Sequence, residues 1–205
     1  MKTLGSIDFS SFGRKYLERL KTLITHADVD AIGRLIRICE QARLAGNVIY
    51  FIGNGGSAAT ASHFASDFLG ANVKCGLNPP YRAVSLCDNT AVLTAFGNDF
   101  GYGRVFLHQL QSLMSGGDIV VAISASGNSP NLIEAVEWAN QNGGRTFALV
   151  GFDGGRLKNL AADCFHCPTG KGEYGPVEDV HLIVDHMINL FVLESMQRLT
   201  VLAPE

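Results

Sequence analysis

Two short loops carry residues that can bind a phosphate group. The first reads Gly-Asn-Gly-Gly-Ser over residues 53–57, and the second reads Ser-Ala-Ser-Gly-Asn-Ser over residues 124–129. Glycine lets the backbone come close to an anion, serine hydroxyls and free amides donate hydrogen bonds, and a following helix adds partial positive charge. Neither loop contains lysine or arginine. The loops therefore indicate one phosphate monoester held by neutral donors, rather than a nucleoside triphosphate with magnesium.

A second set of candidate residues combines two histidines with two carboxylates. His63 and Asp67 are spaced i,i+4, which stacks them on one face of a helix. Glu178 and His186 lie about two turns apart on a later apolar helix, where burial is costly unless they are paired or bind a ligand. The four groups suit zinc or another divalent ion. They could instead move protons without a metal.

Other polar residues have a structural explanation as well as a functional one. His181 and Asp185 lie on the same late helix, where the solvated stripe of an amphipathic helix explains them as well as a ligand does. Cys164 and Cys167 form a lone C-x-x-C, whereas a zinc site needs a second ligand pair at suitable spacing. The chain has five cysteines, an odd number that does not predict a disulfide framework. We expect Cys164 and Cys167 to have a packing role rather than a metal or redox role.

Both loops follow apolar runs that are typical of strands and precede helical patterns. The expected strands cover residues 48–52, 83–86, 119–123, 146–150 and 163–167. The expected helices cover residues 12–24, a segment from residue 28, and residues 57–69, 89–114, 130–142 and 176–199. Strands that alternate with helices predict a parallel sheet covered by helices on both faces.

The predicted fold class is α/β, a three-layer α/β/α sandwich around a five-stranded parallel flavodoxin-like sheet. We expect one domain over residues 1–205, with N-terminal helices in 1–46, an α/β core in 47–170 and a long C-terminal helix in 176–199. The N-terminal helices form an arm. In the strand order 2-1-3-4-5, the first and third strands are neighbours, and the crevice at their carboxyl ends is a ligand site. Both Gly/Ser loops should therefore face one site.

Composition limits the classes of partner. The chain has 205 residues, of which 47% are hydrophobic and 17% charged, and a formal net charge of -3. This charge offers no broad attraction to nucleic acid or anionic lipid. No apolar stretch approaches the roughly 20 residues of a membrane span, and the polar start does not resemble a secretory signal. We expect a cytoplasmic protein that binds neither nucleic acid nor membrane directly.

Several ordered motifs resemble the sugar isomerase (SIS) domain family and, within it, the phosphoheptose isomerase branch. They cover residues 53–57, 63–67, 97–102, 124–129, 151–155 and 178–186. The resemblance implies a homotetramer with active sites at subunit interfaces. It also implies isomerisation of sedoheptulose 7-phosphate to D-glycero-D-manno-heptose 7-phosphate through an enediol, a step toward the heptose of lipopolysaccharide or other surface polysaccharides.

The resemblance also implies roles for individual residues. Asp67 and His186 fall on the family's catalytic pair, and no nucleotide cofactor is implied. The implied zinc ligands are His63, Asp67, Glu178 and His186. The implied substrate-binding residues are Asn54, Gly55, Gly56, Ser57, Asp99, Ser124, Ser126, Ser129 and Glu178. The chain departs from the family at Asp67, where the family has glutamate, at Glu178, where it usually has glutamine, and at Ala71, where it often has arginine.

Three other functions fit some of the same residues. A regulatory SIS protein of the type that binds a replication initiator shares the Gly/Ser loops but lacks the histidine found here at 186, so Asp67 together with His186 favours an enzyme. An isomerase of a different sugar phosphate is a second alternative, because Ala71 and Gly175 change sugar-facing positions. A nucleotide-binding Rossmann enzyme fits poorly, because the first loop lacks the G-x-G-x-x-G spacing.

Overall fold

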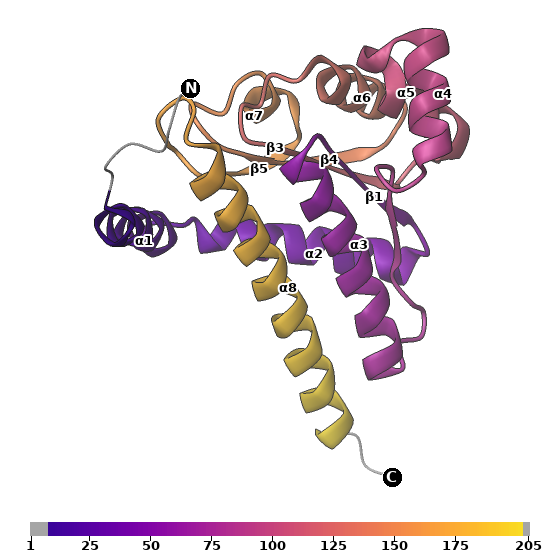
Figure 1. The fold of residues 1–205 in the computed structure, drawn as a ribbon. Helices are drawn as coiled ribbons and strands as arrows, with labels where there is room; N and C mark the ends of the chain where they lie inside the picture. Colours follow the sequence, from indigo (N-terminus) through magenta and orange to yellow (C-terminus); the bar gives the residue numbers. More distant parts are fainter. Residues whose placement is uncertain (1–7, 203–205) are drawn as a thin grey trace.

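The computed structural model describes residues 8–202, with side chains as far as residue 198, and is built around one five-stranded parallel sheet (Figure 1). The strands are β1 (Val48–Gly53), β2 (Arg82–Ser85), β3 (Ile119–Ser124), β4 (Arg145–Val150) and β5 (Asp163–His166). Their order is β2-β1-β3-β4-β5, and every neighbouring pair is parallel. This order confirms the predicted flavodoxin-like sheet, and each strand lies within one residue of its predicted bounds.

Helices cover both faces of the sheet and account for most of the remaining chain. They are α1 (Phe9–Thr25), α2 (Val29–Ala45), α3 (Gly56–Cys75), α4 (Thr90–Phe100), α5 (Val105–Leu113), α6 (Pro130–Gln141), α7 (Leu157–Leu160) and α8 (Tyr174–Leu202), with a 3₁₀ turn η1 (Tyr102–Arg104). Residues 89–114 contain helices as predicted, and Gly101 at φ +84° ends α4 before η1 begins. Helices α3 and α8 both extend beyond their predicted bounds.

Alternation along the strands sends side chains into two separate cores. Phe51 and Val121 face the layer of α2, α3 and α8, whereas Ile52 and Val120 face the layer of α5, α6 and α7 (Figure 1). The rings of Phe51 and Phe64 stack with centroids 5.1 Å apart, which ties α3 to the middle of the sheet. Because α3 and α8 pack on the same face, residues on these two helices can meet.

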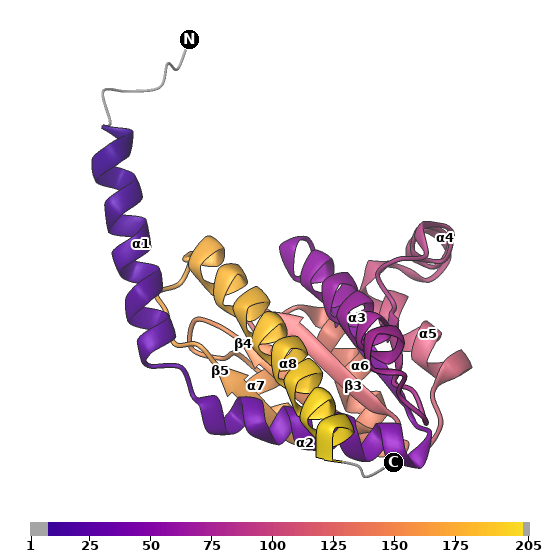
Figure 2. The same cartoon turned by 90° about the horizontal axis from the view of Figure 1, so that it is seen from below.

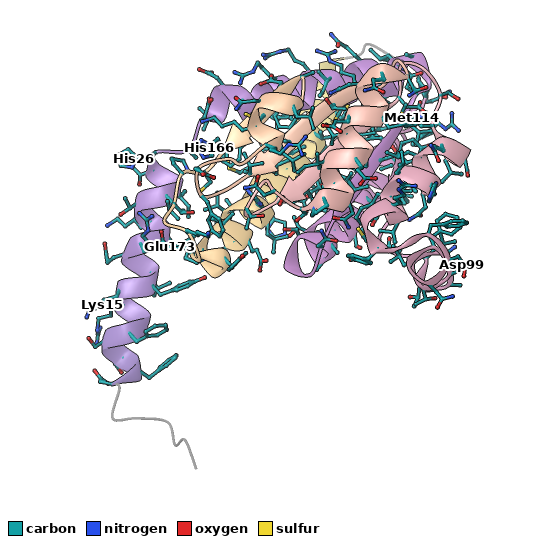
Figure 3. All side chains as sticks on the ribbon, turned by 90° about the horizontal axis from the view of Figure 1, so that it is seen from above. Lys15, His26, Asp99, Met114, His166 and Glu173 are labelled. Carbon is teal, nitrogen blue, oxygen red and sulfur yellow. The ribbon has the colours of Figure 1, made fainter. Side chains whose placement is uncertain are left out.

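Helix α1 extends away from the sheet as an arm (Figure 2), whereas α2, which was predicted to belong to the same arm, packs in the core with Phe51 and Val121. Hydrogen bonds connect α1 to the rest of the chain. Arg19 donates two, of 2.8 and 2.9 Å, to the carboxylate of Glu173, and the hydroxyl of Tyr16 donates one to Asp179. Figure 3 shows Glu173 beside α1, with Lys15 further along the arm. Phe9 and Leu17 on α1 remain 80% and 64% exposed. The arm therefore presents apolar surface of its own.

Two further features bear on the expectations from composition. All five cysteines have free thiols. Burial raises the pKa of the Cys167 thiol to about 11, so this group is a neutral thiol at physiological pH. Within the described residues, no helix combines the length and the apolar character needed to cross a bilayer.

Candidate functional site

The loops that follow β1 and β3 meet at one cavity of about 150 Å³. This is the crevice that the strand order predicts, because β1 and β3 are neighbours in the sheet. The cavity's polar lining consists of Asn54, Ser57, Ser124, Ser126, Ser129, Tyr174 and Glu178. Helix α3 begins at Gly56 and α6 begins at Pro130, so two helix N-termini with free amides lie at its edge. The cavity can therefore hold an anion with neutral donors.

Local hydrogen bonds fix the shape of the second loop. Ser124 Oγ accepts a bond of 3.0 Å from the backbone N–H of Gly127, and Ser126 Oγ accepts one of 3.3 Å from that of Asn128. Gly127 has a φ of +63°, and a Cβ there would lie 2.0 Å from the carbonyl oxygen of Gly154. Only glycine fits this position, and the close approach holds the serines over the cavity.

The first loop is tied to two other elements through Asn54. The side-chain amides of Asn54 and Asn131 exchange two hydrogen bonds of 2.9 Å, which link the loop to α6. The hydroxyl of Tyr102 in η1 donates a further bond of 2.9 Å to Asn54 Oδ1. The two Gly/Ser loops are thus held in one register by Asn131 and Tyr102, which lie outside them.

Glu178 lies against the start of α3. Gly55 precedes this helix with a φ of +55°, and a Cβ on Gly56 would lie 2.3 Å from Glu178 Oε2. Burial raises the pKa of the Glu178 carboxyl, and the nearby negative charge of Asp179 adds to the effect. Glu178 is therefore a carboxyl group at the rim of the serine cavity that gives up its proton less readily than an exposed one.

A second cluster lies further along the same two helices. His63 and Asp67 of α3 meet Asp185 and His186 of α8, and one ligand atom from each lies within 4.8 Å of all the others. His63 Nε2 is 3.8 Å from Asp67 Oδ2 and 3.9 Å from Asp185 Oδ2, and the two imidazole rings are 5.0 Å apart. Two imidazoles and two carboxylates are a donor set that can hold zinc or a similar divalent ion.

The carboxylates of this cluster have different environments. Asn189 donates a hydrogen bond of 2.6 Å to Asp67 Oδ2. Asp185 is 1% exposed, and its Oδ2 atom accepts no hydrogen bond within the part of the chain that the structure describes. Burial raises the pKa of Asp185 to about 8, and the negative charge of Asp67 adds to the rise. A bound cation would favour the ionised form of this carboxyl.

The structure separates some residues that the sequence grouped together. Glu178 lines the serine cavity and is not a member of the histidine and carboxylate cluster, where Asp185 is found instead. His181 is fully buried beside Phe165 and also lies outside the cluster, and burial lowers the pKa of its imidazole to about 4. Asp99 is exposed on α4, does not line the cavity, and points outward (Figure 3).

Sequence reasoning missed three residues that shape the site. Tyr174 lines the serine cavity at the start of α8, and Tyr102 and Asn131 position the first loop. Asn131 directly follows Pro130 after the second loop, so the sequence was sufficient to predict that it lies near the edge of the sheet. Tyr102 ends the 97–102 motif of the family resemblance, which implied no role for it, and Tyr174 belongs to no local pattern that indicates a ligand.

The sheet order and the serine cavity define an α/β protein that can hold an anion at the switch point of its sheet. Residues 12–151 match the SIS domain. The phosphoheptose isomerase of Akkermansia muciniphila is 40% identical over 158 residues, which cover 77% of this chain and 81% of the relative. The chain belongs to the SIS domain family.

Two solved structures extend the similarity to nearly the full chain. The phosphoheptose isomerase of Neisseria gonorrhoeae is 29% identical, with a TM-score of 0.79 over 90% of this chain and 96% of that one. The phosphoheptose isomerase of Francisella tularensis is 25% identical, with a TM-score of 0.77 over 94% of this chain and 98% of that one. The fold, including its long C-terminal helix, is therefore that of these isomerases.

Proposed function

We propose that this protein is an aldose-ketose isomerase that converts sedoheptulose 7-phosphate to D-glycero-D-manno-heptose 7-phosphate. The observation that carries the proposal is the placement of two sites along one pair of packed helices. Ser57 lines the serine cavity and His63 belongs to the cluster, and the rise between them along α3 is roughly 9 Å. An extended sugar phosphate can span this separation, with its phosphate in the cavity and its carbonyl end at the cluster. The names of the relatives support the same reaction.

Each part of the site then has a chemical role. The serines hold the phosphate and fix the position of the sugar chain. Asp67 removes a proton from carbon 1 of the ketose, and the C–H electron pair forms the carbon-carbon double bond of an enediolate. The same carboxyl returns the proton to carbon 2, while His186 moves a proton between the two oxygens, which yields the aldose. No atoms are gained or lost in the isomerisation.

We include zinc in the proposal, held by the cluster that contains His63, Asp67 and His186. The donor set fits a divalent ion, and the atoms lie close enough to share one. The chemistry that a bound divalent ion supplies at such a site is polarisation of the carbonyl and hydroxyl oxygens. Asn189, which donates to Asp67, would hold that carboxylate in position.

We further propose a homotetramer with active sites at subunit interfaces, located in the cytoplasm and supplying heptose for surface polysaccharide. Exposed apolar side chains on two helices support assembly. Phe9 on α1 is 80% exposed, and Leu190 and Phe191 on α8 are 60% and 55% exposed. Large apolar side chains that are this exposed are common at protein interfaces. Light scattering at several protein concentrations would measure the mass of the assembly.

The reaction can be tested by isotope exchange. Purified protein is incubated in deuterated water with sedoheptulose 7-phosphate and with shorter ketose phosphates, and deuterium is located by NMR. We expect deuterium at the exchanging carbon, most rapidly with the seven-carbon substrate, and none with Asp67→Asn. Exchange that is faster with another sugar would reassign the substrate. Binding without exchange of any sugar would favour the regulatory function and overturn the proposal.

A further inference from the structure

One wall of the serine cavity comes from the start of α8. Tyr174 and Glu178 line the cavity from this side, one helical turn apart and therefore on the same face of the helix. The chain that leads into this wall, residues 170–175, is exposed except at Glu173, which is half-buried. The start of a helix that follows an exposed loop frays easily unless other elements hold it. The position of Tyr174 therefore depends on what its neighbours in sequence contact.

Helix α1 contacts the residues on both sides of Tyr174 in sequence. Glu173 lies beside α1 (Figure 3), and the Arg19 guanidinium donates hydrogen bonds of 2.8 and 2.9 Å to its two carboxylate oxygens. The Tyr16 hydroxyl lies 3.0 Å from where a Cβ on Gly175 would be. An ion pair as exposed as that of Arg19 and Glu173 adds little to overall stability, but its two parallel bonds fix one geometry. The main effect of α1 here is therefore to hold the start of α8 in place.

The ring of Tyr174 also packs against Phe152, in the loop after β4. The two ring centroids are 5.0 Å apart in an edge-to-face arrangement. Phe152 has a φ of +45°, in the left-handed region that favours glycine, and no other non-glycine residue in the described part of the chain has a positive φ. Its N–H donates to the Thr169 hydroxyl oxygen, and its carbonyl oxygen lies 3.0 Å from His166 Nε2. Strained residues that their surroundings hold in this way cluster at ligand sites.

The Tyr174 hydroxyl is available to a ligand. It makes no hydrogen bond with the residues that the structure describes, although Tyr174 lines a cavity whose other polar groups are mostly neutral donors. A tyrosine hydroxyl is one more neutral donor. Because α1 fixes its backbone and Phe152 its ring, the group is held in place before a ligand binds, which reduces the entropy cost of binding.

We propose that Tyr174 donates a hydrogen bond to the phosphate bound in the serine cavity, and that Arg19 on α1 is a positioning residue that acts through Tyr174. The inference rests on the proposed function for the nature of the ligand, but its test measures binding and not turnover. Helix α1 then contributes to the affinity of the cavity in addition to presenting apolar surface.

Calorimetric titrations with inorganic phosphate and with sedoheptulose 7-phosphate test both parts of the proposal. Tyr174→Phe removes only the hydroxyl and should weaken both ligands by about 10-fold or more, which is what one hydrogen bond to a charged group contributes. Arg19→Gln removes the two-bond pair with Glu173 and should weaken both by roughly 2- to 10-fold, because the hydroxyl is loosened but not lost. Arg34→Gln is the matched control. It breaks a similar two-bond pair with Asp163, which does not line the cavity, and should bind like the wild type.

A double variant separates positioning from a general structural effect. If Arg19 acts through Tyr174, adding Arg19→Gln to Tyr174→Phe should cause no further loss of affinity, so the two effects should not add. Melting temperatures should change by similar amounts in Arg19→Gln and in the control Arg34→Gln. Additive losses, wild-type affinity in Tyr174→Phe, or an equal loss in Arg34→Gln would overturn the inference.

The outcome is independent of whether the proposed reaction occurs. A protein that exchanges deuterium but whose Tyr174→Phe variant binds phosphate like the wild type refutes this inference alone. A protein that shows the expected losses of affinity but exchanges no deuterium refutes the reaction alone. A wild type that binds neither inorganic phosphate nor the sugar phosphate would overturn both.

Discussion

Two glycines of the first loop should differ in how strongly the same substitution destabilises the protein. A Cβ on Gly56 would lie 2.3, 2.5 and 2.6 Å from three atoms of the Glu178 carboxylate, the end of a flexible side chain. A Cβ on Gly53 would lie 2.5 and 2.6 Å from the carbonyl oxygen and carbon of Ser57, which belong to the first turn of α3. Alanine at 56 therefore displaces a side chain, whereas alanine at 53 must displace backbone.

The expected changes in stability and in ligand affinity depend on which atoms the new methyl group displaces. Overpacking at Gly53 should cost about 1–3 kcal/mol and lower the melting temperature by roughly 3–10 °C in a chain of this size. Alanine at Gly56 gains up to about 1 kcal/mol of helix propensity, so the free energy of unfolding should stay within about 1 kcal/mol of wild type. Displacement into the cavity that brings the Glu178 carboxylate from roughly 10 Å to roughly 6 Å from a bound phosphate raises its repulsion from about 1.7 to about 2.8 kcal/mol at an effective dielectric of 20. Sugar-phosphate affinity should fall on the order of 10-fold.

The assay combines urea denaturation, followed by circular dichroism, with calorimetric titration of the sugar phosphate. The double variant Gly56→Ala, Glu178→Ala is the matched control, because it keeps the new methyl group and removes the displaced carboxylate. Its affinity should recover toward that of Glu178→Ala alone. Equal destabilisation by Gly53→Ala and Gly56→Ala would refute the distinction between backbone and side-chain clashes. A double variant that still binds tenfold more weakly than Glu178→Ala would refute the role of the carboxylate.

Three further predictions concern catalysis, the phosphate loop and pH. Asp67→Asn and His186→Ala should each lower kcat by at least about 100-fold with little change in ligand affinity, since a positioned acid or base contributes about 10²–10⁴-fold; full turnover in either variant contradicts its role. Ser124→Ala should cost about 1 kcal/mol of stability, because the Ser124 hydroxyl accepts a 3.0 Å hydrogen bond from a backbone N–H of its own loop. It should also weaken phosphate binding measured by calorimetry, because Ser124 lines the cavity. Unchanged binding would remove Ser124 from the phosphate site. The Arg34 guanidinium donates two hydrogen bonds to Asp163 and holds the pKa of that carboxyl below its ordinary value. The stability from this pair is present above the unfolded-state pKa of about 3.9 and is lost as the pH falls through the lower folded-state pKa. The free energy of unfolding, measured with urea, should therefore fall more on acidification in the wild type than in Arg34→Gln. Parallel curves of this free energy against pH for the two proteins would count against the contribution of the pair.

The sheet was predictable because its signals are local and repeated. Apolar runs at residues 48–52 and 119–123 end at Gly/Ser loops, and the same alternation continues through the remaining strands. The strand order then brings both loops to one cavity, since neighbouring parallel strands end at the same edge. Local sequence and a general rule of α/β topology were sufficient for this part of the site.

The region between β2 and β3 was less predictable, because its helices depend little on a buried face. No residue of α4 is buried, and Phe100 is 56% exposed at its end. The helical pattern over residues 89–114 predicts helices here but not where α4 ends, which is at Gly101 with its φ of +84°. Tyr102 follows this break and reaches Asn54 through a hydrogen bond that spans 48 positions in sequence. Local periodicity contains no signal for such a contact.

The histidine and carboxylate cluster shows why helix periodicity alone cannot choose between two carboxylates. Seven residues separate Glu178 from Asp185, and at 3.6 residues per turn they lie on nearly the same face of α8. Helix periodicity therefore places both side chains on the face of α8 that packs against α3. Only their position along the axis of α8 distinguishes them. That position depends on where His63 and Asp67 meet α8, which is set by the packing of the two helices on the sheet. The crossing places His63 beside Asp185 and leaves Glu178 against Gly56, so one helix face supplies a carboxylate to each end of the site.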